Sequence, residues 1–379
     1  MTSRERLLCV LGGEMPDRAP ISPFVQEEYL SCYFDKKDTD RLTDAIALAE
    51  ELRFDLIAKQ NIATTPYFMT TCAVNWDVDV KTEIKAGNYY KTTIIKTPGG
   101  TLKQVEGAPN NNKILSGIHL STIKYLIECE DDFILFQKYL PPMNDKTKRQ
   151  IVDSGRFAKK AIGQLGVTAP WAIGGVYNLA STYMNVQNMM VEALIEEEYY
   201  REYMNLFSKL TAENYQLYAE SAFDCVGIQG NIANGAMFGE ALFNEHVLPY
   251  ERRALDVLID AGKPTIYHNC GNAKNLYSCY RALGITVWET VAAPPQGDND
   301  LQTAKAYFDG KLILCGNFDQ VNFLKTATPA EVEDRAAQQM AVGKIGGHYI
   351  FSTSDYLEID TPLENVKAML RGAKAYASY

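Results

Sequence analysis

The second half of this chain alternates short apolar runs with longer helical stretches, and this alternation restricts the possible folds more than any other feature. An alternating strand–helix order implies a parallel sheet, because each helix carries the chain back to the end where the next strand begins. Two earlier apolar runs, near Ile21 and Leu56, bring the number of expected strands to eight. Eight strands of this kind favour a closed (β/α)8 barrel, the TIM barrel, over an open sheet. The later strands are expected at residues 166–172, 225–229, 264–268, 286–290, 312–316 and 349–352.

Residues 74–106 follow a different pattern. They contain β-forming residues in rough alternation, and Pro98-Gly99-Gly100 is a strong turn signal. We expect a β-hairpin or small meander inserted into the barrel, followed by helices near 121–128, 131–139 and 145–160. Because no internal repeat, low-complexity segment or long linker interrupts the chain, the sequence predicts a single TIM-barrel domain over residues 1–379.

Two late helices carry matching start signals. Residues 328–331 and 361–364 both read Thr-Pro-x-Glu. This order fits a capping box in which Thr is the N-cap, Pro is the first helical residue and Glu is the third.

The overall charge and hydropathy exclude some classes of function. The chain has 37 basic and 47 acidic residues, a net charge of −10, and no basic run. Nucleic-acid binding is therefore not expected, because it requires a basic footprint. No apolar stretch is long enough to cross a membrane, and the first residues lack the apolar core of a signal peptide. We expect a cytoplasmic protein. The sequence leaves homo-oligomerisation open.

The ends of the expected strands carry residues that can bind a metal. His268 and Cys270 are separated by one residue at a strand end, and in an extended strand such residues face the same side. Catalytic zinc uses three protein ligands of this kind and leaves one position open. Cys315, at a later strand end, is the expected third ligand, and Glu289, on the strand between, is a fourth or exchangeable one. The spacing alone also fits packing roles for these cysteines, and Glu289 as a general base or a partner for an arginine.

Two polar residues follow another expected strand. Gln229 and Asn231 lie in the segment Ile-Gln-Gly-Asn at 228–231. Their amides could hydrogen-bond a small polar substrate, and they could equally form a turn. We therefore treat them, with Glu289, as candidate catalytic residues.

Nearly the whole chain resembles the uroporphyrinogen decarboxylase superfamily. The matching segments are 4–7 (Arg-Glu-Arg-Leu), 13–20, 169–171 (Ala-Pro-Trp), 243–250 (Phe-Asn-Glu-His-Val-Leu-Pro-Tyr), 268–271 (His-Asn-Cys-Gly), 316–317 (Gly-Asn) and 361–365. The resemblance implies a TIM barrel, in agreement with the strand count. The true decarboxylases carry an arginine-rich segment after the first strand that helps to bind a substrate with many carboxylates. Residues 22–29 of this chain contain two glutamates and no arginine, which would repel such a substrate.

The other branch of the superfamily consists of corrinoid-dependent methyltransferases with a zinc site of His-x-Cys and a later Cys. His268 and Cys270 match the first part. In the members that methylate a thiol, the later Cys falls near the last strand, where this chain has Ser352-Thr353-Ser354. The available thiol here is Cys315, one strand earlier, and Glu289 or Asp355 is the next choice for the third ligand.

The resemblance implies methyl transfer between a small methylated compound and the cobalt of a corrinoid carried by a partner protein. Because the thiol-type cysteine is displaced, we favour a demethylating methyltransferase that acts on an ether, alcohol or amine. The alternatives are a methylcobamide:thiol methyltransferase, a decarboxylase or lyase of the same superfamily, and a small-molecule binder without chemistry.

Overall fold

The strands around Ile21 and Leu56 and the six later strands form one ring. The computed structural model describes residues 1–36, 38–109 and 120–379. β1 (Leu56–Ala58) pairs in parallel with β6 (Gly166–Thr168). A second parallel sheet runs in the order β11-β10-β9-β8-β7. Its strands are β7 (Val226–Gln229), β8 (Thr265–His268), β9 (Val287–Thr290), β10 (Ile313–Phe318) and β11 (Tyr349–Thr353).

Short parallel contacts close the ring. Trp171, just after β6, bridges Gly227 of β7, and Ile21 bridges Phe351 of β11. The amide of Asp55, just before β1, donates to the carbonyl of Ile21. The order around the ring is therefore the Ile21 segment, β1, β6, β7, β8, β9, β10 and β11, and the TIM barrel expected from the sequence is confirmed.

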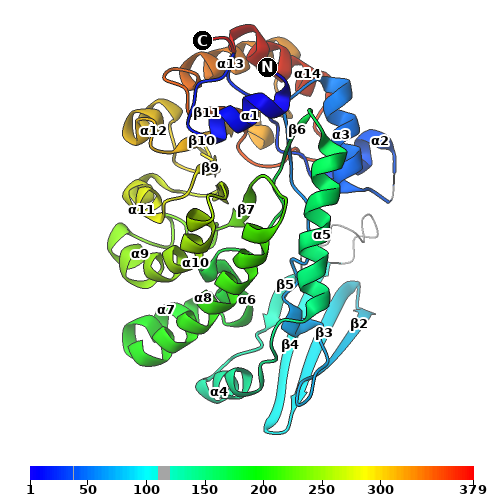
Figure 1. The fold of residues 1–379 in the computed structure, drawn as a ribbon, viewed down its shortest axis with the longest axis vertical. Helices are drawn as coiled ribbons and strands as arrows, with labels where there is room; N and C mark the ends of the chain where they lie inside the picture. Colours follow the sequence, from blue (N-terminus) through cyan, green and yellow to red (C-terminus); the bar gives the residue numbers. More distant parts are fainter. Residues whose placement is uncertain (37, 110–119) are drawn as a thin grey trace.

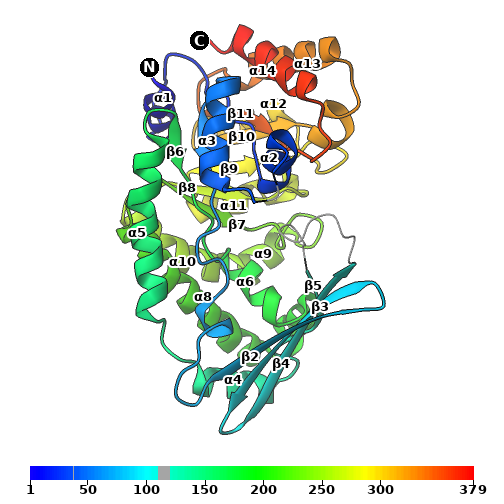
Figure 2. The ribbon, with the colours of Figure 1, turned by 90° about the vertical axis from the view of Figure 1, so that its right-hand side faces the viewer.

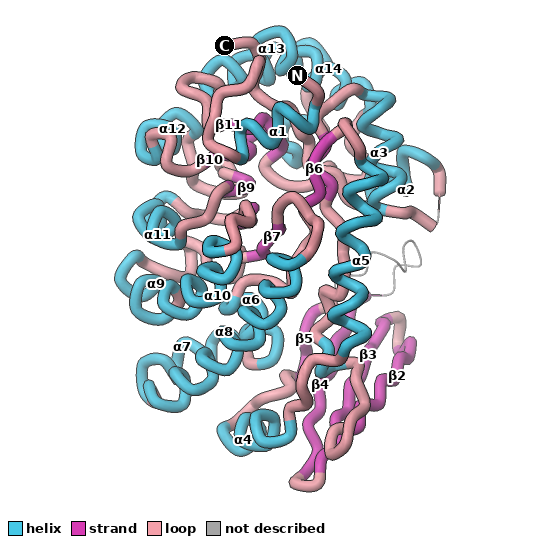
Figure 3. Tube along the Cα trace, viewed as in Figure 1, coloured by secondary structure: helices cyan, strands magenta, loops and turns pink. Residues whose placement is uncertain are grey.

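Helices cover the outside of these strands (Figure 1, Figure 3). Those before the fourth barrel strand are α1 (Ser3–Leu11), α2 (Glu27–Phe34), α3 (Arg41–Leu52), α4 (Glu130–Tyr139), α5 (Asp145–Ile162), α6 (Val176–Tyr183), α7 (Val186–Ile195) and α8 (Glu197–Glu220). The later ones are α9 (Glu240–His246), α10 (Leu248–Asp260), α11 (Tyr277–Leu283), α12 (Leu301–Phe308), α13 (Pro329–Gly343) and α14 (Leu363–Tyr376). Shorter helical segments are η1 (Tyr67–Met69), η2 (Lys274–Leu276) and η3 (Gln320–Leu324).

Helix α1 closes one end of the barrel. Its apolar residues Leu7, Val10 and Leu11 belong to the same buried cluster as the side chains that fill the barrel interior. Its Arg4 pairs with Asp224, which lies two residues before β7, so α1 lies at the end where the strands begin. The opposite end, where the strands finish, is the mouth. This is the end that carries the active site in barrels of this type.

The inserted segment is a four-stranded antiparallel sheet that projects from the barrel beside α4 (Figure 2). It consists of β2 (Asp77–Lys85), β3 (Asn88–Thr97), β4 (Gly100–Pro109) and β5 (Ser121–Lys124). The expected hairpin within 74–106 is confirmed as part of it. The helix expected near 121–128 is wrong, because pairing with the edge of β4 outweighs the local helical pattern and makes β5 a strand.

One of the two expected capping boxes is present. The Thr328 side chain accepts from the amide of Glu331, whose side chain accepts from the Thr328 amide, at the start of α13. The second capping box is not formed, because the helix starts one residue later than expected. Pro362 has an extended backbone and is itself the N-cap, so α14 starts at Leu363 and Thr361 does not cap it.

Within the described residues, none of the helices combines the length and the hydropathy that crossing a bilayer requires.

Candidate metal centre

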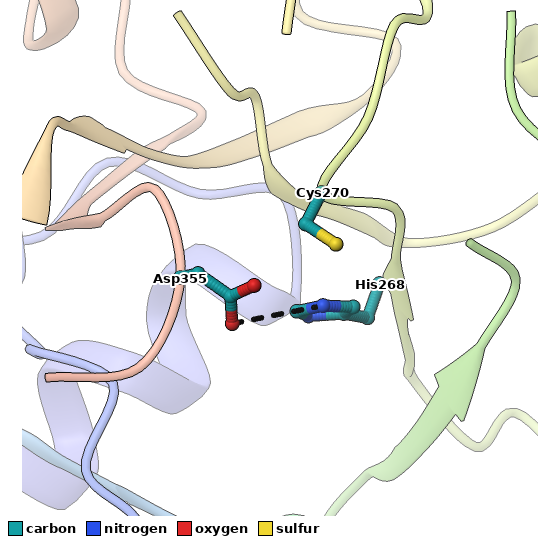
Figure 4. A group of neighbouring side chains, drawn as sticks. All are labelled: His268, Cys270 and Asp355. Atoms are coloured by element: carbon teal, nitrogen blue, oxygen red, sulfur yellow. Dashed lines mark ion pairs between the residues drawn. The ribbon is translucent and has the colours of Figure 1, made fainter. Parts of the chain in front are cut away.

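Three side chains meet at the mouth of the barrel (Figure 4). His268 is the last residue of β8, Cys270 follows two residues later, and Asp355 lies two residues after the end of β11. Their potential ligand atoms all lie within 4.8 Å of one another. Nε2 of His268 is 3.9 Å from Oδ1 of Asp355. One nitrogen, one sulfur and one oxygen are thus directed at a common point, which is a donor set that zinc accepts.

The imidazole of His268 is held by a second carboxylate on its other side. Nδ1 of His268 lies 3.0 Å from Oε2 of Glu289 on the neighbouring strand β9. A metal-binding histidine commonly donates its second ring N–H to such a carboxylate, which fixes the tautomer and the ring orientation. The arrangement leaves Nε2 of His268, which faces Asp355, as the nitrogen able to bind a metal, with Glu289 on the opposite side of the ring.

Glu289 also contacts Lys59, which the sequence analysis missed. Lys59 follows β1 directly, is 4% exposed, and its ammonium donates to Oε2 of Glu289. Its Nζ lies 3.9 Å from the ring centroid of Phe24 and 4.6 Å from that of Trp171. One feature of the sequence could have identified Lys59: it is a charged residue directly after the apolar run 56–58. At that position it lies in the barrel interior, where an unpaired charge is costly.

The charges at this site reinforce one another. Burial alone would lower the pKa of His268, but its interactions with Cys270 and Glu289 and the charge of Asp355 raise that pKa to about 10. Burial alone would raise the pKa of Glu289, but the positive charges of Lys59 and His268 lower it to about 2. Glu289 is therefore an anion at neutral pH.

The structure does not bring Cys315 to this group. β10 extends to Phe318, so Cys315 lies inside the strand, and it packs in the interior cluster with Ile266 and Ile350. Burial raises the pKa of its thiol. Cys315 is in hydrogen-bonding register with Glu289, but barrel strands are tilted, so residues in register on successive strands lie at different depths. Asp355, one of the alternatives for the third ligand, lies in the place expected for Cys315.

Gln229 and Asn231 lie at the same mouth. Both line a cavity of about 460 Å³ together with His268, Cys270 and Asp355. Gln229 ends β7 in register with His268. The side chain of Asn231 accepts a 2.9 Å hydrogen bond from the Asn178 amide. The structure therefore brings together four of the expected site residues, with Glu289 behind them and Cys315 beneath.

The cavity wall also includes aromatic and charged side chains. Phe24, Trp171 and Tyr356 line it, as do Glu28 and Arg41. Arg41 comes from α3, outside the segment 22–29 in which the resemblance leads one to expect arginines. Its guanidinium Nε is 3.4 Å from Oε1 of Glu27, which lines the same cavity.

Two larger cavities lie elsewhere on the molecule. One of about 750 Å³ lies between α12 and α13, and one of about 690 Å³ lies beside α8. Neither is lined by a histidine or a cysteine. We place the candidate functional site at the mouth because the convergent side chains that could hold a metal lie there.

Comparison with known proteins identifies relatives of this chain. A 160-residue region, 41% of the chain, is 27% identical to "Methylcobamide:CoM methyltransferase MtbA" of Methanosarcina acetivorans, and a 157-residue region is 26% identical to the protein of the same name from Methanosarcina mazei. Each match spans 43% of the relative's length. A solved structure described as "methyltransferase from Methanosarcina mazei" covers 99% of both chains with a TM-score of 0.70 and 13% identity, and so shares the fold.

The family profile described as "Uroporphyrinogen decarboxylase (URO-D)" matches residues 123–376, which is more than half of the chain. The match includes every barrel strand from β6 onward and the His268, Cys270 and Asp355 group. The resemblance found in the sequence is therefore confirmed, and the chain belongs to the uroporphyrinogen decarboxylase family.

Proposed function

We propose that this chain is a zinc-dependent methyltransferase that moves a methyl group between a small methylated donor and the cobalt of a corrinoid bound to a separate protein. The observation that carries the proposal is the convergence of His268, Cys270 and Asp355 on one point inside the mouth cavity. The similarity to two relatives named methylcobamide:CoM methyltransferases supports the same class of reaction.

The three side chains fit a zinc ion. The Cys270 thiolate and the Asp355 carboxylate together match the charge of a divalent cation. His268 would add a neutral nitrogen once the ion displaces the proton from Nε2, while Nδ1–H still donates to Glu289. Three protein ligands leave one of the four positions of zinc for the substrate. Bound here, zinc would act as a Lewis acid that makes the donor's oxygen or nitrogen a better leaving group.

The chain's own residues bind and orient the donor. Gln229 and Asn231 offer amides from the wall of the cavity, and Asn178 holds Asn231 in place. Phe24 and Trp171 are almost fully buried beside the His268 ring and exclude water from that side of it. A corrinoid protein would approach from the open mouth and take the methyl group as a cation equivalent, while the donor heteroatom gains a proton.

The ligand set favours the demethylating direction. Position 355 offers a carboxylate instead of a thiolate, so zinc bound here would have one thiolate ligand fewer. Because a carboxylate donates less electron density than a thiolate, the ion would polarise an ether, alcohol or amine more strongly. The names of the two relatives favour the second candidate, transfer from methylcobamide to a thiol. A decarboxylase with a substrate rich in carboxylates is disfavoured because Glu27 and Glu28 line the cavity beside a single arginine.

Zinc content per chain tests the proposal first. Wild type should hold about one zinc by elemental mass spectrometry, as expected for a single catalytic site. Cys270→Ser and Asp355→Asn should lose it, and Cys315→Ser, the matched control, should retain it. Folded wild type that holds no zinc after reconstitution would refute the metal centre. Loss in Cys315→Ser with retention in Asp355→Asn would restore Cys315 as the third ligand.

Transfer itself is measured on the zinc-loaded chain. Reduced corrinoid protein is mixed with methylated ethers, alcohols or amines, and methyl-cobalt formation is followed by visible absorption. Formation that requires both the donor and Cys270 supports the demethylating direction. Methyl-cobalt that is consumed only when a thiol is added supports the second candidate. Turnover of a carboxylated substrate without corrinoid would contradict both.

A further inference from the structure

Lys59 and Glu289 come from opposite sides of the barrel. β1 is the second member of the ring and β9 is the sixth, so three strands lie between them in either direction. The side chain of Lys59 crosses the interior below the mouth to reach Glu289, and both side chains are 2% exposed. The pair therefore joins two walls of the barrel directly beneath the metal centre.

The ammonium of Lys59 has few other partners. In the described part of the chain its one hydrogen bond goes to Oε2 of Glu289, and the rings of Phe24 and Trp171 supply the remaining favourable contacts. Burial makes such a charge dependent on its partner, because water cannot replace the lost interaction. Lys59 thus attracts the Glu289 carboxylate strongly and from one fixed direction.

The same carboxylate oxygen also faces His268. Oε2 of Glu289 interacts with Lys59 and lies 3.0 Å from Nδ1 of His268. Glu289 is absent from the group of ligand atoms around Nε2, although it contacts a member of that group. A carboxylate released from the lysine could turn towards a divalent cation only one imidazole away, because carboxylate oxygen is a good zinc ligand.

We propose that Lys59 is a positioning residue that holds Glu289 on Nδ1 of His268 and thereby keeps it from becoming a fourth metal ligand. The open coordination position of the centre then depends on a buried charge on the far wall of the barrel. The proposal rests on the metal centre of the proposed function and not on the identity of the methyl donor.

Cobalt(II) loaded into the purified chain provides the test, because its visible spectrum reports the ligands directly. Lys59→Met removes the charge and keeps a similar length. We expect an altered cobalt spectrum and about tenfold weaker binding of an added thiol, 2-mercaptoethanol, because Glu289 takes the open position. Lys59→Arg, which keeps the charge, should retain the wild-type spectrum and thiol affinity. Lys305→Met, at a half-buried lysine of the outer helix α12, is the matched control and should also match wild type.

The double variant Lys59→Met/Glu289→Gln separates this role from a merely structural one. Without the carboxylate, the open position should return and thiol binding should recover towards wild type. If Lys59→Met fails to fold, Lys59→Gln replaces it with the same expected outcomes. A Lys59→Met spectrum and thiol affinity equal to wild type would overturn the inference, and so would weak thiol binding that persists in the double variant. Wild type that binds no cobalt would overturn the metal centre itself, which distinguishes the two failures.

Discussion

The mouth and the interior of this barrel use the same residue type in opposite ways. At the mouth, Cys270 is half-buried and lies beside His268 and Asp355. Deeper in the barrel, Cys225 and Cys315 are buried among apolar side chains, and burial raises the pKa of both thiols. Because the thiolate is the form that binds a metal, depth in the barrel decides which cysteine can be a ligand.

Exchanging the side chains typical of the mouth and the interior should have the largest effect on stability. Cys315→Asp would place a carboxylate among Ile266, Ile350 and other apolar groups, and we expect it to lower the free energy of unfolding by more than about 4 kcal/mol or to prevent folding. The reciprocal change at the mouth, Asp355→Cys, should cost less than about 1 kcal/mol, because that side chain is partly exposed. Urea denaturation measures both. An equal loss of unfolding free energy in the two variants would mean that the environments of residues 315 and 355 do not differ as described.

Two buried glutamates extend the comparison. Glu289 is paired with Lys59, whereas in the described residues no salt bridge reaches Glu251 of α10. Glu251 accepts a 3.0 Å hydrogen bond from the amide of Tyr177, and its Oε2 has no partner there. Burial raises the pKa of Glu251 to about 7 against the effect of these backbone hydrogen bonds. The carboxylate of Glu289 is thus kept charged, whereas that of Glu251 is kept protonated below neutral pH.

Glu251 should make stability depend on pH. Its folded pKa lies above the unfolded value, so the native state binds more protons, and stability is lost as pH rises from about 4.5 to about 7. The loss should be about 1 to 3 kcal/mol across that window, and Glu251→Gln should remove most of it. Urea midpoints at several pH values measure the slope. Glu202→Gln, at an exposed position of α8, is the control, and the same slope in all three proteins would contradict the assignment.

The smallest expected effect concerns thiol reactivity and leaves stability unchanged. Cys32, Cys72 and Cys129 are exposed and should react with a thiol reagent whether or not zinc is bound. Removing zinc with a chelator should add one fast-reacting thiol, Cys270, because the metal protects its sulfur. Cys270→Ser should abolish this increase and Cys315→Ser should not. An increase that disappears only in Cys315→Ser would reverse the comparison between mouth and interior.

The barrel and two of the three side chains of the candidate metal centre could be predicted from local sequence pattern. Short apolar runs separated by helices gave all eight strand positions, because each strand buries its side chains within a few residues. His268 and Cys270 were found because alternate residues of a strand face one side. The β5 segment was misread, since its partner β4 lies outside any local window.

The rest of the site depends on geometry that a linear pattern does not contain. Cys315 was chosen because it lies near a strand end, but the tilt of the strands places it one layer deeper than His268. Lys59 meets Glu289 across the barrel, 230 residues away in sequence. Arg41 reaches the cavity from α3 and Asp355 from a loop, where no periodicity indicates the direction of a side chain.

Helix α1 seals the end of the barrel opposite His268, and this arrangement bears on the kinetics of the proposed reaction. A small donor and a much larger corrinoid would share one entrance, and the donor would occupy the deeper position beside Cys270. A seated corrinoid protein would block the donor's route in both directions. Binding would then follow a compulsory order with the donor first, and excess corrinoid protein would inhibit turnover in competition with the donor.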